Sequence, residues 1–252
     1  MTAERRISIE CQRYNPEQDT EPHYQTYEVP FTDDMSVLQG LQYIKDHLDG
    51  SLTFRWSCRM AICGSCGIMI NGVPSLGCHT FLRDLVSQGK VRVEPLTHFP
   101  IQRDLAIDQT DFLRKLESVK PYIIPAKDVT PADGAYRQTP LQIDEYYQFS
   151  ECINCLLCYA ACPQYGLNPQ FTGPAALTLL HRYNADSRDA GTAERMAIIN
   201  GENGVWGCTL VSYCSEVCPK HVDPARAINQ NKINSTKDYF LRFISPRGAD
   251  KG

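Results

Sequence analysis

The cysteines of this 252-residue sequence constrain its fold and chemistry more than any other feature. Eleven of the twelve fall into three groups with short, regular spacings: Cys58, Cys63, Cys66 and Cys78; Cys152, Cys155, Cys158 and Cys162; and Cys208, Cys214 and Cys218. The second and third groups each end in a Cys-Pro pair. They differ at one place, because Val211 stands where the spacing of the second group would put a cysteine.

The grouping of these cysteines favours metal ligands over disulfides. Residues Met1–Glu10 are polar and charged and lack the apolar stretch of a secretory signal peptide. Disulfides are typical of exported proteins, whereas spaced cysteines in a chain that is not exported are usually ligands. No apolar run approaches the roughly 18 residues that a membrane span needs. We therefore expect a soluble or peripheral protein that binds metal.

At 252 residues the chain is long enough for one large domain or two ordinary ones. Apolar residues make up 42% of the chain and charged residues 21%, so the chain can bury a core. The net charge of −4 argues against a general nucleic-acid-binding protein. We place the domain boundary near residue 105. Residues 1–105 are expected to form an α+β domain, and residues 106–252 an all-α domain that holds cysteine loops.

Apolar periodicity predicts the individual elements. Strands are expected at residues 6–11, 24–31, 68–70 and 91–93, with helices at 36–48, 104–120, 174–183, 192–200 and 223–240. Asn71-Gly72 predicts a tight turn after the third strand. The segment after Pro219 carries seven Lys and Arg against three Asp. This basic C-terminal segment is expected to be a solvated helix face, with a patch for anionic lipid or an acidic partner as the alternative.

The first cysteine group has the plant-type [2Fe–2S] spacing, Cys-x4-Cys-x2-Cys with a fourth cysteine further on. Two irons with bridging sulfides need four thiolates, and a short loop must bring three of them together. Gly64 and Gly67 lie inside that loop, where glycine lets backbone N–H groups approach sulfur. A zinc site is the alternative, but zinc sites usually use two Cys-x2-Cys pairs.

The second group has the spacing of bacterial ferredoxins, in which the fourth cysteine binds the other cluster. This exchange assigns Cys152, Cys155, Cys158 and Cys218 to a [4Fe–4S] cluster. It leaves Cys162, Cys208 and Cys214 for the other cluster. Three thiolates with an apolar residue in the fourth place predict a [3Fe–4S] cluster.

The three-cysteine site has an alternative interpretation, and the twelfth cysteine lies outside the groups. Ser212 or Ser215 could supply a fourth ligand to the three-cysteine site, in which case Val211 would be ordinary core. Cys11 has no partner group and lies in an expected strand, so we expect it to be a buried apolar residue.

Motifs for substrate chemistry are missing from the sequence. It has no Gly-rich dinucleotide fingerprint, no Walker loop, no nucleophile elbow and no paired histidines with metal spacing. Three clusters of different size in one chain predict an electron-transfer protein that passes single electrons between partners.

Two cysteine motifs also indicate a family. Ser57–Gly67 and Cys218–Pro224 resemble the iron–sulfur subunits of the succinate dehydrogenase and fumarate reductase family. Cys162–Pro169, Gly173–Ala176 and His181–Asn184 are similar to the fumarate reductase branch. Succinate dehydrogenases usually carry a Ser and a Trp pair after that Cys-Pro, whereas this chain has Gln164 and Tyr165.

This resemblance implies an N-terminal β-grasp plant-type ferredoxin domain and a C-terminal helical ferredoxin-like domain. It implies a flavoprotein partner with covalent FAD and the fumarate site, membrane-anchor subunits, and a quinone such as menaquinol beside the [3Fe–4S] cluster. In the family, residues after the first cysteine of the third group line the quinone pocket; here they are Thr209 and Leu210. A family lysine matches Lys232, whereas the family's glutamine is Asn229, which is shorter by one methylene.

The resemblance therefore predicts the iron–sulfur subunit of a membrane-bound quinol:fumarate oxidoreductase, with no catalytic residue of its own. It would lie peripherally on the cytoplasmic face of the bacterial inner membrane. The alternative within the family is a succinate dehydrogenase subunit, and the alternative outside it is a free ferredoxin-like carrier.

Overall fold

The structure is a computed structural model that describes residues 5–126 and 130–244. Arg247, Asp250 and Lys251 of the basic C-terminal segment lie outside the described residues. Contacts divide the chain into two units. Unit 1 contains the described residues up to Asp111, with Ile153–Ala161 and Val217–Lys220. Unit 2 contains the described parts of 112–152, 162–216 and 221–244.

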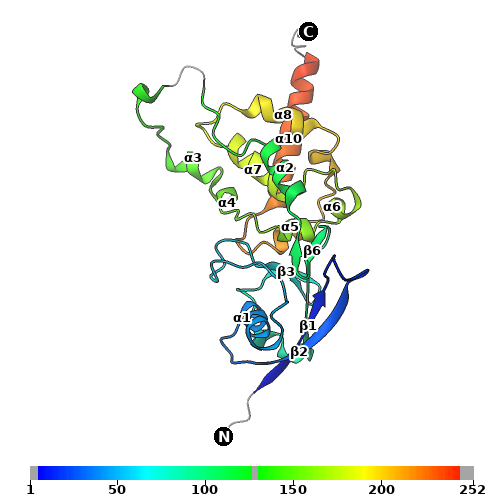
Figure 1. The fold of residues 1–252 in the computed structure, drawn as a ribbon. Helices are drawn as coiled ribbons and strands as arrows, with labels where there is room; N and C mark the ends of the chain where they lie inside the picture. Colours follow the sequence, from blue (N-terminus) through cyan, green and yellow to red (C-terminus); the bar gives the residue numbers. More distant parts are fainter. Residues whose placement is uncertain (1–4, 127–129, 245–252) are drawn as a thin grey trace. The chain divides into compact units, whose positions relative to one another are not determined.

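Unit 1 is built on a mixed five-stranded sheet with the order β2-β1-β5-β3-β4 (Figure 1). Its strands are β1 (Arg6–Arg13), β2 (His23–Pro30), β3 (Gly67–Ile70), β4 (Val73–Leu76) and β5 (Lys90–Glu94). β1 pairs antiparallel with β2 and parallel with β5. The predicted strands and the Asn71-Gly72 turn between β3 and β4 are confirmed, and both turn residues have the positive φ that such a turn requires.

The core of unit 1 lies between this sheet and one helical segment. Alternate residues of β1 face the core, so Ile7, Ile9 and Cys11 are buried. They pack with buried residues of α1 (Val37–Tyr43) and of η1 (Ile44–Leu48), a π-helical continuation of α1. The prediction for Cys11 is confirmed: burial raises the pKa of its thiol to about 12, so it behaves as an apolar residue.

Arg13 continues the inward alternation of β1 and therefore brings a positive charge into the interior. Its guanidinium donates hydrogen bonds to Asp104, Asp49 and the Tyr27 hydroxyl. Hydrogen bonds from Ser51 and Tyr27, together with Arg13, hold the pKa of Asp49 well below its usual range. Because a buried charge is tolerated only when it is paired, this network ties β1 to loops distant in sequence.

Asp104 explains where the expected helix at residues 104–120 differs from the structure. Its carboxylate accepts hydrogen bonds from Arg13 and from the backbone N–H groups of Tyr14 and Thr53. These bonds keep Asp104 in a left-handed turn with φ 45°. The short strands β6 (Ile101–Arg103) and β7 (Ala106–Ile107) flank this turn, and α2 begins only at Thr110 and ends at Ser118.

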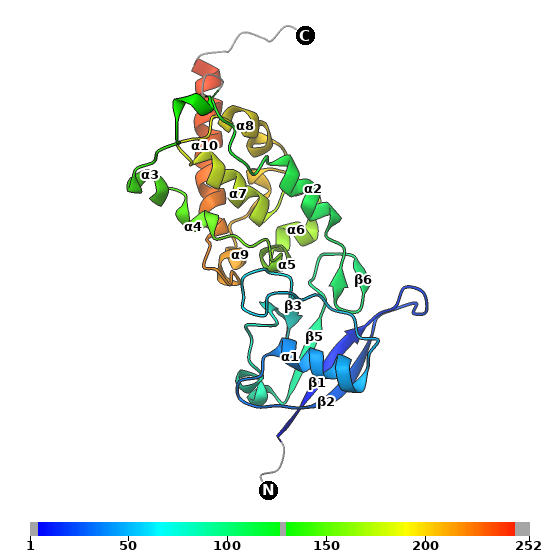
Figure 2. The same cartoon turned by 60° about the vertical axis from the view of Figure 1, so that its left-hand side comes forward.

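Unit 2 contains most of the helices (Figure 2). The remaining helical segments of the described residues are η2 (Leu82–Asp84), η3 (Val86–Gln88), η4 (Pro131–Asp133), α3 (Pro140–Asp144), α4 (Tyr147–Ser150), α5 (Leu157–Ala160), α6 (Pro163–Leu167), α7 (Pro174–Asn184), α8 (Thr192–Asn200), η5 (Val205–Gly207), α9 (Tyr213–Glu216) and α10 (Pro224–Ile244). η2, η3 and α5 belong to unit 1. The expected helices at 174–183, 192–200 and 223–240 correspond to α7, α8 and α10.

Two buried polar residues fix the packing of unit 2. α10 packs against α7, where the buried Asn231 donates its amide to the carbonyl of Leu177 at 3.1 Å. Arg195 of α8 is fully buried and pairs with Asp189. It also donates to the backbone carbonyls of Lys120 and Tyr122, which anchors the segment after α2. Of the helices in the described part of the chain, none has the length and apolar character that a membrane crossing requires.

The α+β class predicted from the sequence is confirmed. The domain boundary near residue 105 stays a prediction. Contacts do not divide the described residues at a single point in the sequence. Two cysteine-bearing segments from the second half of the chain, Ile153–Ala161 and Val217–Lys220, belong to unit 1.

We predict that Arg13→Met destabilises the protein strongly. The substitution leaves Asp104 and Asp49 without their positive partner, and breaking a buried pair in this way costs about 3–5 kcal/mol. The midpoint of thermal unfolding, followed by circular dichroism, should fall by several degrees. Arg103→Met is the matched control, since Arg103 is exposed and its replacement should change stability by less than about 0.5 kcal/mol. Equal midpoints for the two variants would contradict this role for Arg13.

Candidate metal centres

The first cysteine group lies in a loop whose backbone N–H groups point at sulfur. The Sγ atom of Cys58 accepts from the N–H groups of Met60, Ile62 and Cys63 at 3.3–3.4 Å. The Sγ atom of Cys78 accepts from Ala61 at 3.3 Å. Such donors stabilise negative charge on sulfur, which is the form that binds iron.

The backbone of this loop is held in an unusual conformation. Arg59 and Ala61 have φ values of 60° and 57°, a left-handed geometry that is uncommon for residues with a Cβ atom. This geometry turns successive N–H groups inward toward the cysteines. The strain that it stores indicates that the surrounding contacts over-determine the loop, as is usual at functional sites.

The thiols of the first group differ in their tendency to ionise. Burial opposes ionisation of Cys63, but hydrogen bonds from Ser65 and the Cys58 backbone lower the pKa of its thiol to about 6. Cys66 is more deeply buried, and burial raises the pKa of its thiol. Four cysteines with inward N–H donors fit a [2Fe–2S] cluster, because iron replaces the proton of a buried thiol.

Gly64 brings the first and second cysteine groups together within unit 1. A Cβ atom at Gly64 would lie 2.8 Å from the Cβ of Cys155 and 2.9 Å from the carbonyl oxygen of Ile153. Gly67 meets the same segment, since a Cβ there would lie 2.8 Å from the carbonyl oxygen of Cys155. The two glycines therefore allow the two cysteine loops to touch backbone to backbone. The sequence suggested glycines near sulfur but not this contact.

We predict that Gly64→Ala impairs loading of the first two cysteine groups. The added methyl group would clash with Cys155, so the loops must separate. Gly72→Ala is the matched control: Gly72 has a similar positive φ of 80° but no atom within 4 Å of the added Cβ. Iron and acid-labile sulfide per chain should fall in Gly64→Ala and not in Gly72→Ala. Equal contents in both variants would show that the close approach does not matter.

The second cysteine group is divided between the units. Cys155 and Cys158 belong to unit 1, and Cys152 and Cys162 belong to unit 2. Asn154 and Leu156, on either side of Cys155, have left-handed φ values of 53° and 69°. The loop therefore uses the same backbone device as the first group.

Unit 2 brings together the three cysteines of the predicted three-iron site. Cys162 is the N-cap of α6, Cys208 follows η5, and Cys214 lies in α9. Burial is the main cause that raises the pKa of the Cys214 thiol to about 12, and the neighbouring Cys162 and Cys208 raise it further. This thiol keeps its proton at neutral pH unless a metal displaces it. Backbone N–H groups of Tyr165 and Leu210 point at Cys162 and Cys208.

Val211, Ser212 and Ser215 are the residues that the sequence suggests for the fourth-ligand position of this site. Val211 is 46% exposed, so it is not ordinary core. The hydroxyl of Ser215 donates to Asp223 at 2.6 Å and accepts from the N–H of Ala225, so it is used at the start of α10. The hydroxyl of Ser212 donates to the carbonyl of Leu210 at 3.3 Å. Both serines thus have protein partners in this structure.

No group of three or more His, Cys, Asp or Glu among the described residues is arranged around one point as a single metal ion requires. A cluster distributes its thiolates over several irons, so its cysteines are spaced more widely than those around one ion.

Two family models of iron–sulfur domains match the chain, one over the first cysteine group and one over the later cysteines. Residues 8–114 match the family model for a 2Fe-2S iron-sulfur cluster binding domain, and residues 144–219 match that for a 4Fe-4S dicluster domain. The chain is 58% identical over 252 residues to the fumarate reductase iron-sulfur subunit of Haemophilus influenzae, with 96% of this chain and 98% of that protein covered. The chain belongs to the family of fumarate reductase iron–sulfur subunits.

Succinate dehydrogenase subunits are more distant relatives of this fumarate reductase family member. The succinate dehydrogenase iron-sulfur subunit of Coxiella burnetii is 36% identical over 232 residues, with 89% of this chain and 94% of that protein covered. A chain of the Mycobacterium smegmatis Sdh1 complex in the apo form has the same fold, with a TM-score of 0.86 at 26% identity, and the match covers 94% of this chain and 98% of that chain. The family resemblance found in the sequence is therefore confirmed.

The four residues that the fumarate reductase resemblance places near a quinone lie around Cys208 and on α10. Thr209, Leu210 and Asn229 are exposed. Lys232 is half-buried, and its ammonium donates to the carbonyl of Cys208 at 2.6 Å. The ammonium of Lys232 also lies 5.4 Å from the ring centre of Trp206, a residue that no motif in the sequence indicates.

Proposed function

We propose that this chain is the electron-transfer subunit of a membrane-bound quinol:fumarate oxidoreductase. Electrons would enter from quinol beside Cys208 and leave to the FAD of a flavoprotein partner, where fumarate is reduced. The observation that carries this proposal is the similarity to fumarate reductase iron–sulfur subunits over nearly the full chain. The loops that hold the cysteines also point backbone N–H groups at sulfur.

The three cysteine groups would hold three clusters, which supply one-electron redox steps. The [2Fe–2S] cluster would use Cys58, Cys63, Cys66 and Cys78. The [4Fe–4S] cluster would use Cys152, Cys155, Cys158 and Cys218. The [3Fe–4S] cluster would use Cys162, Cys208 and Cys214. The protein itself would contribute N–H donors to sulfur and apolar burial, which are two of the means by which proteins tune cluster potentials.

The chain would have no catalytic residue of its own and would act between two partners. A flavoprotein subunit would hold covalent FAD and the fumarate site, and membrane-anchor subunits would hold the complex peripherally on the cytoplasmic face of the bacterial inner membrane. Thr209, Leu210 and Lys232 are the candidates for contacts to quinone. The shorter side chain of Asn229 would leave a gap that a family glutamine fills.

We predict that the complex purified from membranes contains this chain together with a flavoprotein and reduces fumarate with a menaquinol analogue. Assays should be run in both directions, with menaquinol and ubiquinone analogues. Faster succinate oxidation with ubiquinone would favour the succinate dehydrogenase alternative. A chain that is stable alone and purifies without flavin would be a free carrier, and zinc without acid-labile sulfide would contradict the cluster assignment.

We predict that Val211→Cys converts the three-iron centre to a four-iron centre. A thiol at this position would offer the missing fourth ligand, so the EPR signal of the oxidised [3Fe–4S] cluster should disappear and the iron content should rise by one per chain. Ser212→Cys is the matched control, because it places a thiol one residue away. An unchanged signal in Val211→Cys, or conversion in Ser212→Cys alone, would show that position 211 does not face the vacant corner.

A further inference from the structure

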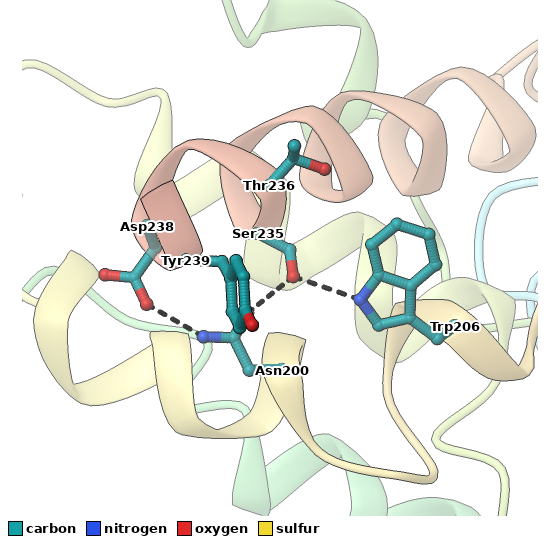
Figure 3. A pocket seen from close by; sticks show the side chains of 6 residues that line it. All are labelled: Asn200, Trp206, Ser235, Thr236, Asp238 and Tyr239. Atoms are coloured by element: carbon teal, nitrogen blue, oxygen red, sulfur yellow. Dashed lines mark hydrogen bonds between the residues drawn. The ribbon is translucent and has the colours of Figure 1, made fainter. Parts of the chain in front are cut away.

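A series of hydrogen bonds links Trp206 of η5, Asn200 of α8, and Ser235 and Asp238 of α10 (Figure 3). The indole N–H of Trp206 donates to the hydroxyl of Ser235 at 3.0 Å. That hydroxyl donates to the side-chain oxygen of Asn200 at 2.6 Å, and the Asn200 amide donates to the carboxylate of Asp238 at 2.9 Å. This hydrogen-bond series therefore runs from the indole ring of Trp206 to the negative charge of Asp238.

The direction of every bond in this chain is fixed by its last member. A carboxylate only accepts hydrogen bonds, so Asn200 must present its amide nitrogen to Asp238 and its oxygen to Ser235. The hydroxyl of Ser235 must then donate to Asn200, which leaves its lone pairs for the N–H of Trp206. Ser235 is buried, and its replacement by alanine would remove the protein acceptor of the Trp206 N–H.

Trp206 needs this chain because the protein covers only part of its ring. Its side chain lies at the wall of a cavity of about 420 Å³, and the residue is 55% exposed. Tyr239, Thr236 and Asp238 of α10 line the same cavity. A half-exposed indole has freedom to change rotamer, and the bond to Ser235 is the polar contact that selects one orientation.

The selected orientation places the indole against Lys232. The ammonium of Lys232 lies 5.4 Å from the ring centre and donates to the carbonyl of Cys208 at 2.6 Å. A cation within about 6 Å of an indole face is attracted to it. Lys232, Ser235 and Tyr239 are spaced at three and four residues, so they share one face of α10. The ring and the carbonyl together hold the charge beside a cysteine of the three-iron site.

We propose that Trp206 is a positioning residue, oriented through Ser235, Asn200 and Asp238, that fixes the ammonium of Lys232 for binding of quinol. This inference rests on the proposed function, because it takes Lys232 to be the residue that meets the quinol oxygen. The hydrogen-bond chain does not touch the ligand. It sets where the positive charge stands before the ligand arrives, which lowers the cost of ordering that charge on binding.

Ser235→Ala in the purified complex tests the proposal. The quinol KM should rise about threefold to tenfold, because the net free energy of one hydrogen bond corresponds to a factor of about this size in a binding constant. The kcat should stay within about twofold of the parent value. Acrylamide quenching of tryptophan fluorescence should increase. In a Trp56→Phe background Trp206 is the one tryptophan of this chain, and the partner subunits are the same in both complexes, so the difference in quenching between Ser235→Ala and its parent is assigned to Trp206. Fumarate reduction with reduced methyl viologen, which bypasses quinol, should not change.

Thr236→Ala is the matched control for Ser235→Ala. Thr236 lines the same cavity on the same helix. Its hydroxyl donates to the backbone carbonyl of Lys232 within α10 and takes no part in the hydrogen bonds that link Trp206 to Asp238. The KM and the quenching of this variant should equal those of the parent. A rise in KM as large as that in Ser235→Ala would mean that α10 is merely sensitive to substitution, and would overturn the proposal.

A double-mutant cycle with Trp206→Phe separates positioning from general damage. Phenylalanine keeps a ring but has no N–H, so the Ser235→Ala change should have no further effect on KM in the Trp206→Phe background. Additive effects would overturn the proposal, as would unchanged quenching in Ser235→Ala. If Trp206→Phe fails to assemble, the quenching and KM of Ser235→Ala still decide the question. If the unmodified complex does not reduce fumarate with reduced methyl viologen, that result would instead contradict the proposed function.

Discussion

Backbone N–H groups that point at cysteine sulfur are the interaction on which the cysteine loops depend. Cys58, Cys78, Cys162 and Cys208 each accept such bonds. At Cys162 the donor is an N–H group in the first turn of α6, whereas the loops around Cys58, Cys78 and Cys208 turn their N–H groups inward next to residues in a left-handed conformation. In the described chain this conformation recurs at non-glycine residues inside all three groups: Arg59, Ala61, Asn154, Leu156, Leu210 and Ser212.

This geometry has an energetic cost that the rest of the fold must offset. Each left-handed residue with a Cβ atom costs of order 1–3 kcal/mol. Buried charge networks such as that of Arg13, and the fully buried pair of Arg195 with Asp189, are the contacts that brace the surrounding elements. The cluster ligands proposed here would add metal bonding to the same balance, because the energy of binding metal is also folding energy.

Local patterns in the sequence predicted much of the fold. Alternation gave the core face of β1, Asn71-Gly72 gave the β3–β4 turn, and helical periodicity gave α7, α8 and α10. The expected helix at 104–120 was wrong at its start, because Asp104 is held by Arg13 and Thr53, and such long-range bonds leave no periodic signal. Trp206 was missed for the same reason: its partners Ser235 and Lys232 lie almost 30 residues away in sequence. The cysteine groups could be recognised in the sequence because the ligands of an iron–sulfur cluster follow characteristic short spacings.

The contact of Gly64 with Cys155 has a consequence for how the protein is made. Ribosomes deliver the first cysteine group long before the second, yet the two loops belong to one unit and touch without side chains between them. The first domain therefore cannot finish its surface until the later segment has been synthesised and packed. The close packing of the first two cysteine loops therefore depends on residues more than 80 positions apart in the sequence.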